Sequence, residues 1–204
     1  MFEDLKAQAI VDFHNACHAH AAWPGQPPQP LAEDSVWFWV AANHRHNCQL
    51  WGEEDQARRR DVPDADIVGN KRAIDANNQA RNDAIERMDE HILTRLNAVT
   101  LRPDAWFNSE TAGSIIDRLS IVSLKILNMG KLAADPAKDE ALRAEAAQKV
   151  ARLHEQRDDL AFCFDQLLGG YAEGRCYYRI YRQFKMYNDP RLNPYLAASA
   201  KRNG

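Results

Sequence analysis

The chain has 204 residues, of which 45% are hydrophobic and 27% are charged, and its formal net charge is −3 at pH 7. This length suits one domain with one core, and the acidic balance argues against general nucleic-acid binding. The longest clean apolar run, residues 36–42, is far too short to cross a bilayer, and the first residues lack the pattern of a signal peptide. Four scattered cysteines without C-x-x-C spacing indicate reduced thiols, so we expect a cytoplasmic protein.

Proline and glycine clusters divide the first half of the chain into three predicted helices. Apolar residues recur at helical spacing within each of them. In order, we expect a helix over about 2–22, a proline-rich linker at 24–30, a helix from Glu33 or Asp34 to about Arg59, a loop over 61–69 and a long helix over about 70–98.

The second half predicts three more helices. In order, we expect an irregular stretch over 101–113, a helix over 114–129 capped by Ser109 or Thr111, a helix from Asp135-Pro136 to Leu168, a break at Gly169-Gly170, an aromatic helix over about 171–187 and an irregular proline-rich tail over 188–204. The helix over 114–129 is apolar on nearly every side, so it should lie at the centre of the fold. No strand pattern stands out. The prediction is an all-α, single-domain bundle of five to six helices spanning residues 1–204.

An arginine–aspartate pattern occurs twice, 76 residues apart, on helices that are predicted to be buried. Its three charged residues are Arg81, Asp83 and Asp89 in the first copy, and Arg157, Asp159 and Asp165 in the second. Charged groups at core positions cost several kcal/mol unless they are paired, so the pattern predicts a polar network inside the bundle. It also indicates two helical hairpins related by a pseudo-two-fold axis, with chance similarity as the alternative.

The second predicted helix carries the densest polar segment, because Asn43, Asn47 and Glu54 continue its core-facing stripe. The arginines of the repeated pattern are the expected partners of Glu54 or Asp55. Two interpretations are open. The polar groups form a closed salt-bridge network that fixes helix register, or they line a pocket in which arginines hold a carboxylate or phosphate and a histidine transfers a proton.

The pocket interpretation assigns candidate residues to two roles. The catalytic candidates, which transfer protons or orient other groups, are His44, His46, Glu54, Asp55 and Asp117. The substrate-binding candidates are Asn43, Asn47, Arg58, Arg81, Arg118 and Arg157. Asp117 and Arg118 belong to these sets because they place charges in the most apolar helix. The alternative for that pair is a helix end emerging at the surface.

We predict no cofactor and no metal site, but three divalent-metal arrangements are alternatives. One is a set on a single helix face, His14, Cys17 and His18, which lacks a fourth ligand. Another uses His44 or His46, which lie about 200° apart around a helix and would need carboxylates from other helices. The third is magnesium on clustered carboxylates, as in helical nucleotide pyrophosphatases, with Glu53, Glu54, Asp55, Asp83 and Asp159; neighbouring arginines would repel that ion.

The last predicted helix alternates basic and aromatic residues, which can stack on nucleobases and hold phosphates. At helical spacing, however, one face carries Tyr178, Tyr181 and Lys185, and another carries Arg175, Arg179 and Arg182. A core-facing tyrosine row with a solvated basic face is the preferred interpretation, and nucleic-acid binding is not expected.

Three stretches together resemble the bacterial family catalogued as domain of unknown function 4254. They are Asn43-His44-Arg45-His46-Asn47 with Leu50-Trp51 and Glu54-Asp55, the run Gly113 to Ile121, and the run Tyr187 to Tyr195. The resemblance covers essentially the whole chain. It implies no established activity and no assigned catalytic residue, but it implies a genomic setting near glycosyltransferases of envelope polysaccharide assembly.

Two functions are compatible with these observations. The first is an enzyme in envelope polysaccharide biosynthesis, a transferase for example, acting on a small anionic substrate such as a phosphorylated or nucleotide-linked sugar. The second is a non-catalytic helical adaptor of a glycan-assembly enzyme such as a glycosyltransferase, with a purely structural polar core and the segment 188–196 as its docking segment. Neither function requires membrane insertion.

Overall fold

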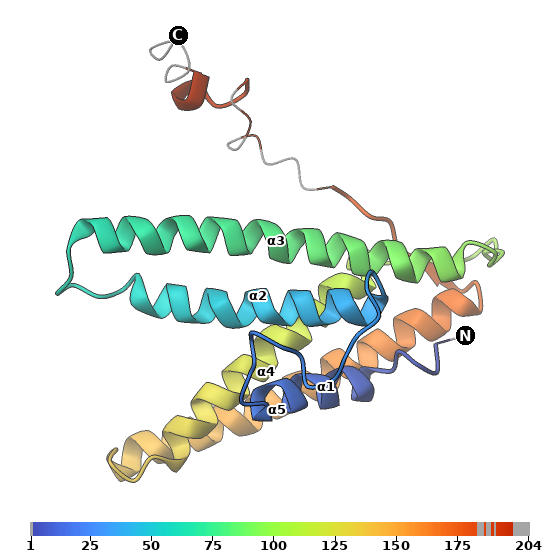
Figure 1. Ribbon diagram of the computed structural model, residues 1–204. Coiled ribbons are helices and arrows are strands. Elements are labelled where there is room, and N and C mark those ends of the chain that lie inside the picture. Colours follow the sequence, from blue (N-terminus) through green and yellow to red (C-terminus); the bar gives the residue numbers. More distant parts are fainter. Residues whose placement is uncertain (1, 183–185, 187–188, 190, 198–204) are drawn as a thin grey trace.

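The computed structural model describes residues 2–182, 186, 189 and 191–197. Five helices supply nearly all of its regular structure. In chain order the elements are α1 (Ala7–Ala19), α2 (Val36–Gln56), α3 (Asp64–Leu96), β1 (Trp106–Phe107), α4 (Ala112–Ala134), α5 (Glu140–Ala172) and β2 (Cys176–Tyr177) (Figure 1). The all-α prediction is confirmed. Over the described part of the chain, every helix is too short or too polar to cross a membrane.

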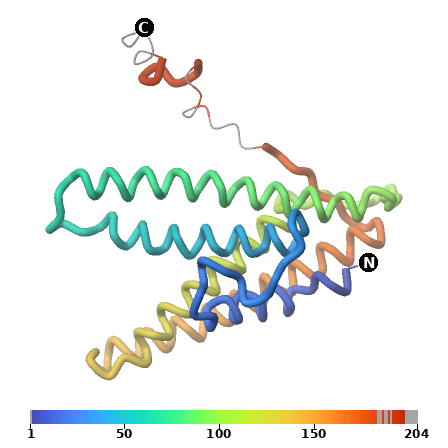
Figure 2. The backbone as a smooth tube through the Cα atoms, viewed as in Figure 1, coloured from blue at the N-terminus to red at the C-terminus, as the bar shows by residue number. Residues whose placement is uncertain are grey.

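The helices form two hairpins, α2 with α3 and α4 with α5, and α1 packs against α4 and α5 (Figure 2). α2 and α4 begin at Val36 and Ala112, and α3 and α5 begin at Asp64 and Glu140. Each pair is offset by 76 residues, which is also the offset of the arginine–aspartate pattern. The boundaries therefore confirm the internal repeat, and the hairpins are its two copies.

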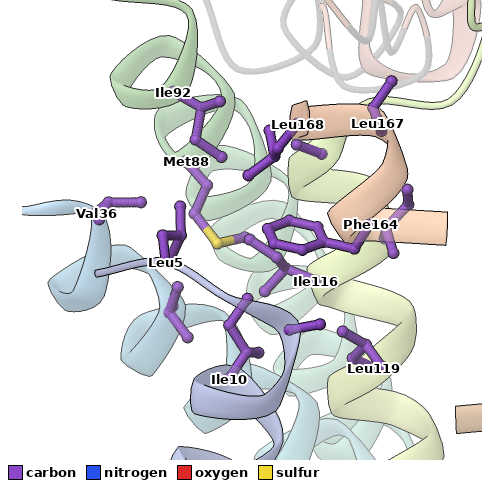
Figure 3. Packing of buried hydrophobic residues seen from close by; sticks show 14 of the residues in the cluster. Leu5, Ile10, Val36, Met88, Ile92, Ile116, Leu119, Phe164, Leu167 and Leu168 are labelled. Atoms are coloured by element: carbon purple, nitrogen blue, oxygen red, sulfur yellow. The ribbon is translucent and has the colours of Figure 1, made fainter. Parts of the chain in front are cut away.

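One hydrophobic core fills the space between the hairpins, and α4 lies at its centre, in contact with each of the other four helices. In Figure 3, Met88 and Ile92 of α3 meet Ile116 of α4 and Phe164 of α5. Met88 and Phe164 are equivalent in the two repeats, as are Ile92 and Leu168, and all four are at most 3% exposed. Full burial of such a side chain contributes about 1.5–3 kcal/mol, so this shared layer holds the hairpins together.

The last aspartate of each arginine–aspartate pattern caps a helix from another part of the chain. Asp89 Oδ1 accepts a hydrogen bond from the backbone N–H of Gly113, in the first turn of α4, at 2.7 Å. The equivalent Asp165 accepts one from the backbone N–H of Ala7, the first residue of α1, at 3.0 Å. The first N–H groups of a helix lack partners within it, and the helix dipole favours a negative charge there. These two aspartates therefore attach α4 and α1 to the long helices.

Several helix boundaries differ from the predictions. α3 begins inside the predicted loop 61–69, because Pro63 takes the extended conformation of a cap and two aspartates follow in the first turn. The cap of α5 is Asp139, whose carboxylate accepts from the N–H of Leu142 at 2.8 Å, and not Asp135. α1 and α2 are each a few residues shorter than predicted. Thr111 caps α4, as predicted, but α4 begins at Ala112, inside the predicted irregular stretch 101–113, and continues beyond residue 129 to Ala134. β1 also lies inside that stretch.

The predicted sixth helix over 171–187 is wrong for the part of it that the structure describes. α5 continues through Gly169-Gly170, where each glycine costs only about 1 kcal/mol. Gly174 then ends the helical course with a φ of +70°, which other residues rarely adopt. The aromatic residues that follow suit extended backbone, and β2 pairs in parallel with β1.

The predicted tyrosine row and basic face do not form on the described residues. Tyr178 is 2% exposed, whereas Tyr181 is 67% exposed. Arg175 pairs with Glu173, and Arg182 pairs with Glu86 and Glu90, whereas Arg179 lies over the rings of Phe107 and Tyr177. Residues 183–185, 187–188 and 190 lie outside the described residues, as does the end of the tail from 198. Within the predicted irregular tail, residues 194–197 form one helical turn.

Candidate functional site

A polar network joins α2, α3 and α4 at Asp117, which is 9% exposed. Its Oδ1 accepts hydrogen bonds from Asn43 Nδ2 at 2.8 Å and from Asn47 Nδ2 at 2.9 Å. Arg81 Nε lies 3.9 Å from the same oxygen, which makes an ion pair without a hydrogen bond. The buried carboxylate thus has both a counter-charge and donors. This part of the interior is a closed network.

The network continues from Asn47 through Ser120 of α4 to His44 of α2. Asn47 Nδ2 donates to Ser120 Oγ at 3.0 Å, and Ser120 Oγ lies 2.8 Å from His44 Nδ1. His44 is fully buried. Its other nitrogen, Nε2, lies 4.0 Å from Cys48 Sγ, one turn further along α2. The polar chain therefore ends at an imidazole and a thiol.

α1 and the turn that follows it complete this cluster around His44. His18 of α1 places Nε2 2.6 Å from Ser123 Oγ. Trp23, in the turn after α1, donates from Nε1 to Cys48 Sγ at 3.2 Å and stacks on the ring of His44 with centroids 5.3 Å apart. Two serines of α4 thus hold one nitrogen on each of two imidazoles.

Burial keeps these groups uncharged near neutral pH. Desolvation, with a smaller contribution from His18, lowers the pKa of His14 to about 3. Desolvation also lowers the pKa of His44 well below its ordinary value. For His18, burial and the charge of Lys131 both lower the pKa. Burial raises the pKa of the Cys48 thiol. The cluster consists of neutral imidazoles and a neutral thiol.

A cavity of about 280 Å³ opens beside this cluster, between α1, α2 and α4. Its walls include His18, His20, Cys48 and the indoles of Trp23 and Trp51, and none of its described lining residues is acidic. A larger groove of about 1020 Å³ along α4 and α5 shares Trp51 and a neighbouring asparagine with it, so the two spaces adjoin.

The structure brings five of the predicted site residues together. Asn43, His44, Asn47, Asp117 and Arg81 belong to one continuous network. The predicted polar interior therefore exists. Arg81, however, pairs with Asp117 and not with Glu54 or Asp55.

The remaining predicted site residues lie apart from this network. His46 Nδ1 contacts Asn77 Oδ1 at 2.9 Å, Arg58 pairs with Glu54 at 3.0 Å, Arg118 pairs with Glu110 at 2.9 Å, Arg157 lies 3.8 Å from Asp158, and Asp55 is exposed. The expected pairing of Arg157 with Glu54 or Asp55 is therefore wrong. The physical reason is visible in Figure 1, where the closed ends of the two hairpins lie well apart and the end of α2 has no third helix to face.

Sequence reasoning missed Cys48, Ser120, Ser123 and Trp23 as parts of the site. Cys48 had a usable signal, since it follows His44 by four residues and shares its helix face. Of the set predicted on α1, His14 and His18 both contact the ring of His44 on α2, with centroids 4.3 and 4.8 Å apart. Cys17 is buried and lines the same cavity. Which helix α1 would face could not be inferred from its own pattern.

The carboxylate arrangement of a magnesium-dependent pyrophosphatase does not form. Glu53 accepts from Asn70 at 2.7 Å, Asp83 accepts from Gln79 at 2.7 Å, and Glu54 has its own arginine. Over the described chain, the sole group of three or more side chains close enough to share one ion is His18, His44 and Cys48, whose ligand atoms all lie within 4.8 Å of one another.

The fold and the site define an all-α protein of two repeated helical hairpins, with a histidine, cysteine and tryptophan cluster beside a cavity. A family model described as "Protein of unknown function (DUF4254)" matches residues 37–180. The match covers more than half of the chain, so the chain belongs to this family. No curated protein and no solved structure matches the chain.

Proposed function

We propose that this chain is an enzyme that acts on a small anionic substrate, a phosphorylated or nucleotide-linked sugar, bound in the cavity between α1, α2 and α4. Envelope polysaccharide biosynthesis is the setting that we expect. The observation that carries the proposal is a cavity with two indole walls, nearby cations and no carboxylate among its described lining residues.

The indoles of Trp23 and Trp51 suit a sugar, because a flat aromatic face can pack on its C–H surface while polar groups fix the hydroxyls. The cations suit a phosphate. The charge of Lys131 acts on His18 strongly enough to lower its pKa, and the Arg45 guanidinium lies 5.9 Å from the centre of the Trp23 ring. An anion in the cavity would meet a positive field.

The adjoining groove supports a substrate larger than a sugar phosphate. Its apolar walls include Met129, Leu132 and Leu153, and Lys125 lies on its edge without a salt bridge among the described residues. A nucleotide-linked sugar would place its sugar and a phosphate in the cavity and its base in the groove.

Within this proposal, proton transfer belongs to His20. His20 lines the cavity, and its ring has no hydrogen bond to the described residues. His44 is fully buried behind the wall, and His46 faces α3, so neither reaches the cavity.

Calorimetric titration tests the proposal with inorganic phosphate, a hexose 1-phosphate, a uridine diphosphate hexose and the neutral hexose. We expect the phosphorylated compounds to bind and the neutral sugar not to bind. Lys131→Met should weaken binding by about threefold to tenfold, because it removes a positive charge that acts near the cavity. Trp51→Leu should also weaken it, whereas the exposed control Trp106→Leu should not. Equal affinity for the neutral sugar, or no binding at all, would contradict the proposal.

The second candidate is the non-catalytic adaptor, and two observations favour it. The network at Asp117 is closed, and the groove along α4 and α5 is mostly apolar. On this reading the groove receives a glycosyltransferase. Leu132→Glu would then abolish that association while leaving the affinity for sugar phosphates unchanged.

A further inference from the structure

We propose that His18, His44 and Cys48 form a site for one zinc-type metal ion, with a coordination position open to the cavity between α1, α2 and α4. This inference goes beyond the proposed function. The site needs no sugar phosphate, and only its use as a Lewis acid rests on the proposed substrate.

The geometry of the three ligand atoms carries the proposal. They lie within 4.8 Å of one another, and His44 Nε2 and Cys48 Sγ are 4.0 Å apart. A tetrahedral zinc ion with bonds of about 2.0–2.1 Å to nitrogen and 2.3 Å to sulfur separates these two atoms by about 3.5 Å. Side-chain rotations that close the cluster by a few tenths of an ångström therefore suffice for this pair. Two imidazoles and a thiolate are ligands that select zinc, cobalt or copper over magnesium.

The outer hydrogen bonds leave one ring nitrogen free on each histidine. Ser120 Oγ holds His44 Nδ1 at 2.8 Å, and Ser123 Oγ holds His18 Nε2 at 2.6 Å. His44 Nε2 and His18 Nδ1 remain for the ion. A ligating histidine usually donates its other N–H to an oxygen, which fixes its ring orientation. Since both serines lie on α4, one turn apart, this helix orients both ligands.

The third ligand has an outer partner as well. Trp23 Nε1 donates to Cys48 Sγ at 3.2 Å, and such a bond stabilises a thiolate. His44, fully buried, otherwise meets only the distant thiol with its Nε2. The 4.0 Å contact between His44 Nε2 and Cys48 Sγ is long for a hydrogen bond, and an ion bound between these two atoms would replace it with two short ligand bonds.

The position of the cluster makes the site an open one. His18 and Cys48 line the cavity, so a fourth ligand would come from that side. Structural zinc sites have four protein ligands, whereas sites with three protein ligands keep a position for water or substrate. An oxygen of an anionic substrate could occupy that position.

Metal binding is tested on the full chain after chelation and dialysis. We expect one zinc or cobalt ion per chain by elemental analysis. The cobalt form should show the visible bands of tetrahedral coordination and a thiolate-to-cobalt charge-transfer band in the near ultraviolet. Cys48→Ser should remove the charge-transfer band, and His18→Asn should remove stoichiometric binding. The matched controls Cys163→Ser, an exposed cysteine, and His20→Asn should leave both unchanged.

Ser123→Ala provides a graded test, because losing an outer partner weakens metal binding by roughly 10–100-fold. If Cys48→Ser does not fold, His18→Asn decides alone, since His18 lies at the cavity wall. Absence of stoichiometric metal, an octahedral cobalt spectrum, or binding that survives His18→Asn would overturn the site. Titrating the metal-free chain with a hexose 1-phosphate tests the proposed function separately, so a failure of the metal site can be distinguished from a failure of sugar-phosphate binding.

Discussion

Asp89→Asn should make the free energy of unfolding less sensitive to pH. Asp89 is buried, and desolvation raises its pKa from 3.8 to about 6, although the Thr111 hydroxyl, the Gly113 amide and the nearby Tyr178 hydroxyl oppose the shift. The Tyr178 hydroxyl lies near Asp89 but forms no hydrogen bond with it, whereas the backbone N–H of Gly113 does. Burial is the dominant cause.

A raised pKa in the folded chain makes the free energy of unfolding depend on pH, because the folded and unfolded chains bind different numbers of protons. Between pH 3.8 and about 6 the folded chain holds a proton on Asp89 that the unfolded chain has lost, so stability falls as the pH rises through this window. Two pKa units correspond to about 3 kcal/mol, of which about 2 kcal/mol falls between pH 4.5 and 7.5. The amide of Asn cannot ionise, yet its Oδ1 can still accept from Gly113.

Urea unfolding followed by circular dichroism at several pH values measures this difference. The stability of Asp89→Asn relative to the wild type should increase by about 2 kcal/mol from pH 4.5 to 7.5. Comparing two chains cancels the other titrating groups, and the exposed Asp83→Asn controls for the loss of one negative charge on α3. A difference that stays constant with pH, or that decreases, would refute the burial argument.

Two further predictions concern the packing and the network at α4. Gly113→Ala should lower the free energy of unfolding by at least about 2 kcal/mol, because the new Cβ would lie 2.7 Å from the carbonyl oxygen of Ile85. Gly130→Ala, on the same helix, should raise it by about 0.5–1 kcal/mol, because its Cβ would meet no other atom. Thermal unfolding compares the two variants. Asp117→Asn should lower the free energy of unfolding by about 2–4 kcal/mol, because Arg81 and the amides of Asn43 and Asn47 lose the negative charge that they contact. The exposed control Arg118→Met should change it by less than about 1 kcal/mol. Equal effects within either pair would contradict these assignments.

The repeated architecture could be predicted because its signals lie within single helices. Apolar spacing predicted the helices, and the 76-residue offset of Arg81 and Arg157 matched the offset of whole hairpins. The role of the arginine–aspartate pattern could not be predicted from the sequence. Its last aspartates bind backbone N–H groups of α4 and α1, and only the packing of helices far apart in sequence brings these groups together.

The sequence predicted the buried asparagines of α2 but not the cluster of His18 and Cys48 beside them. Asn43 and Asn47 sit at core-facing positions of α2, so their burial followed from helical periodicity. Glu54 continues the same stripe but is not buried, because the hairpin extends beyond α4 there (Figure 1). The cluster of His18 and Cys48 depends on how α1 and the linker fold back on α2, and no local pattern encodes that contact.

We propose the cavity between α1, α2 and α4 as the functional site. Nuclear magnetic resonance of the isotope-labelled chain tests it directly, because the five tryptophans give separate indole N–H signals. Titration with a hexose 1-phosphate should shift the signals of Trp23 and Trp51, which line the cavity, and leave that of Trp106 in place. Unchanged Trp23 and Trp51 signals at saturating ligand, or shifts confined to Trp106, would show that the ligand does not bind in this cavity.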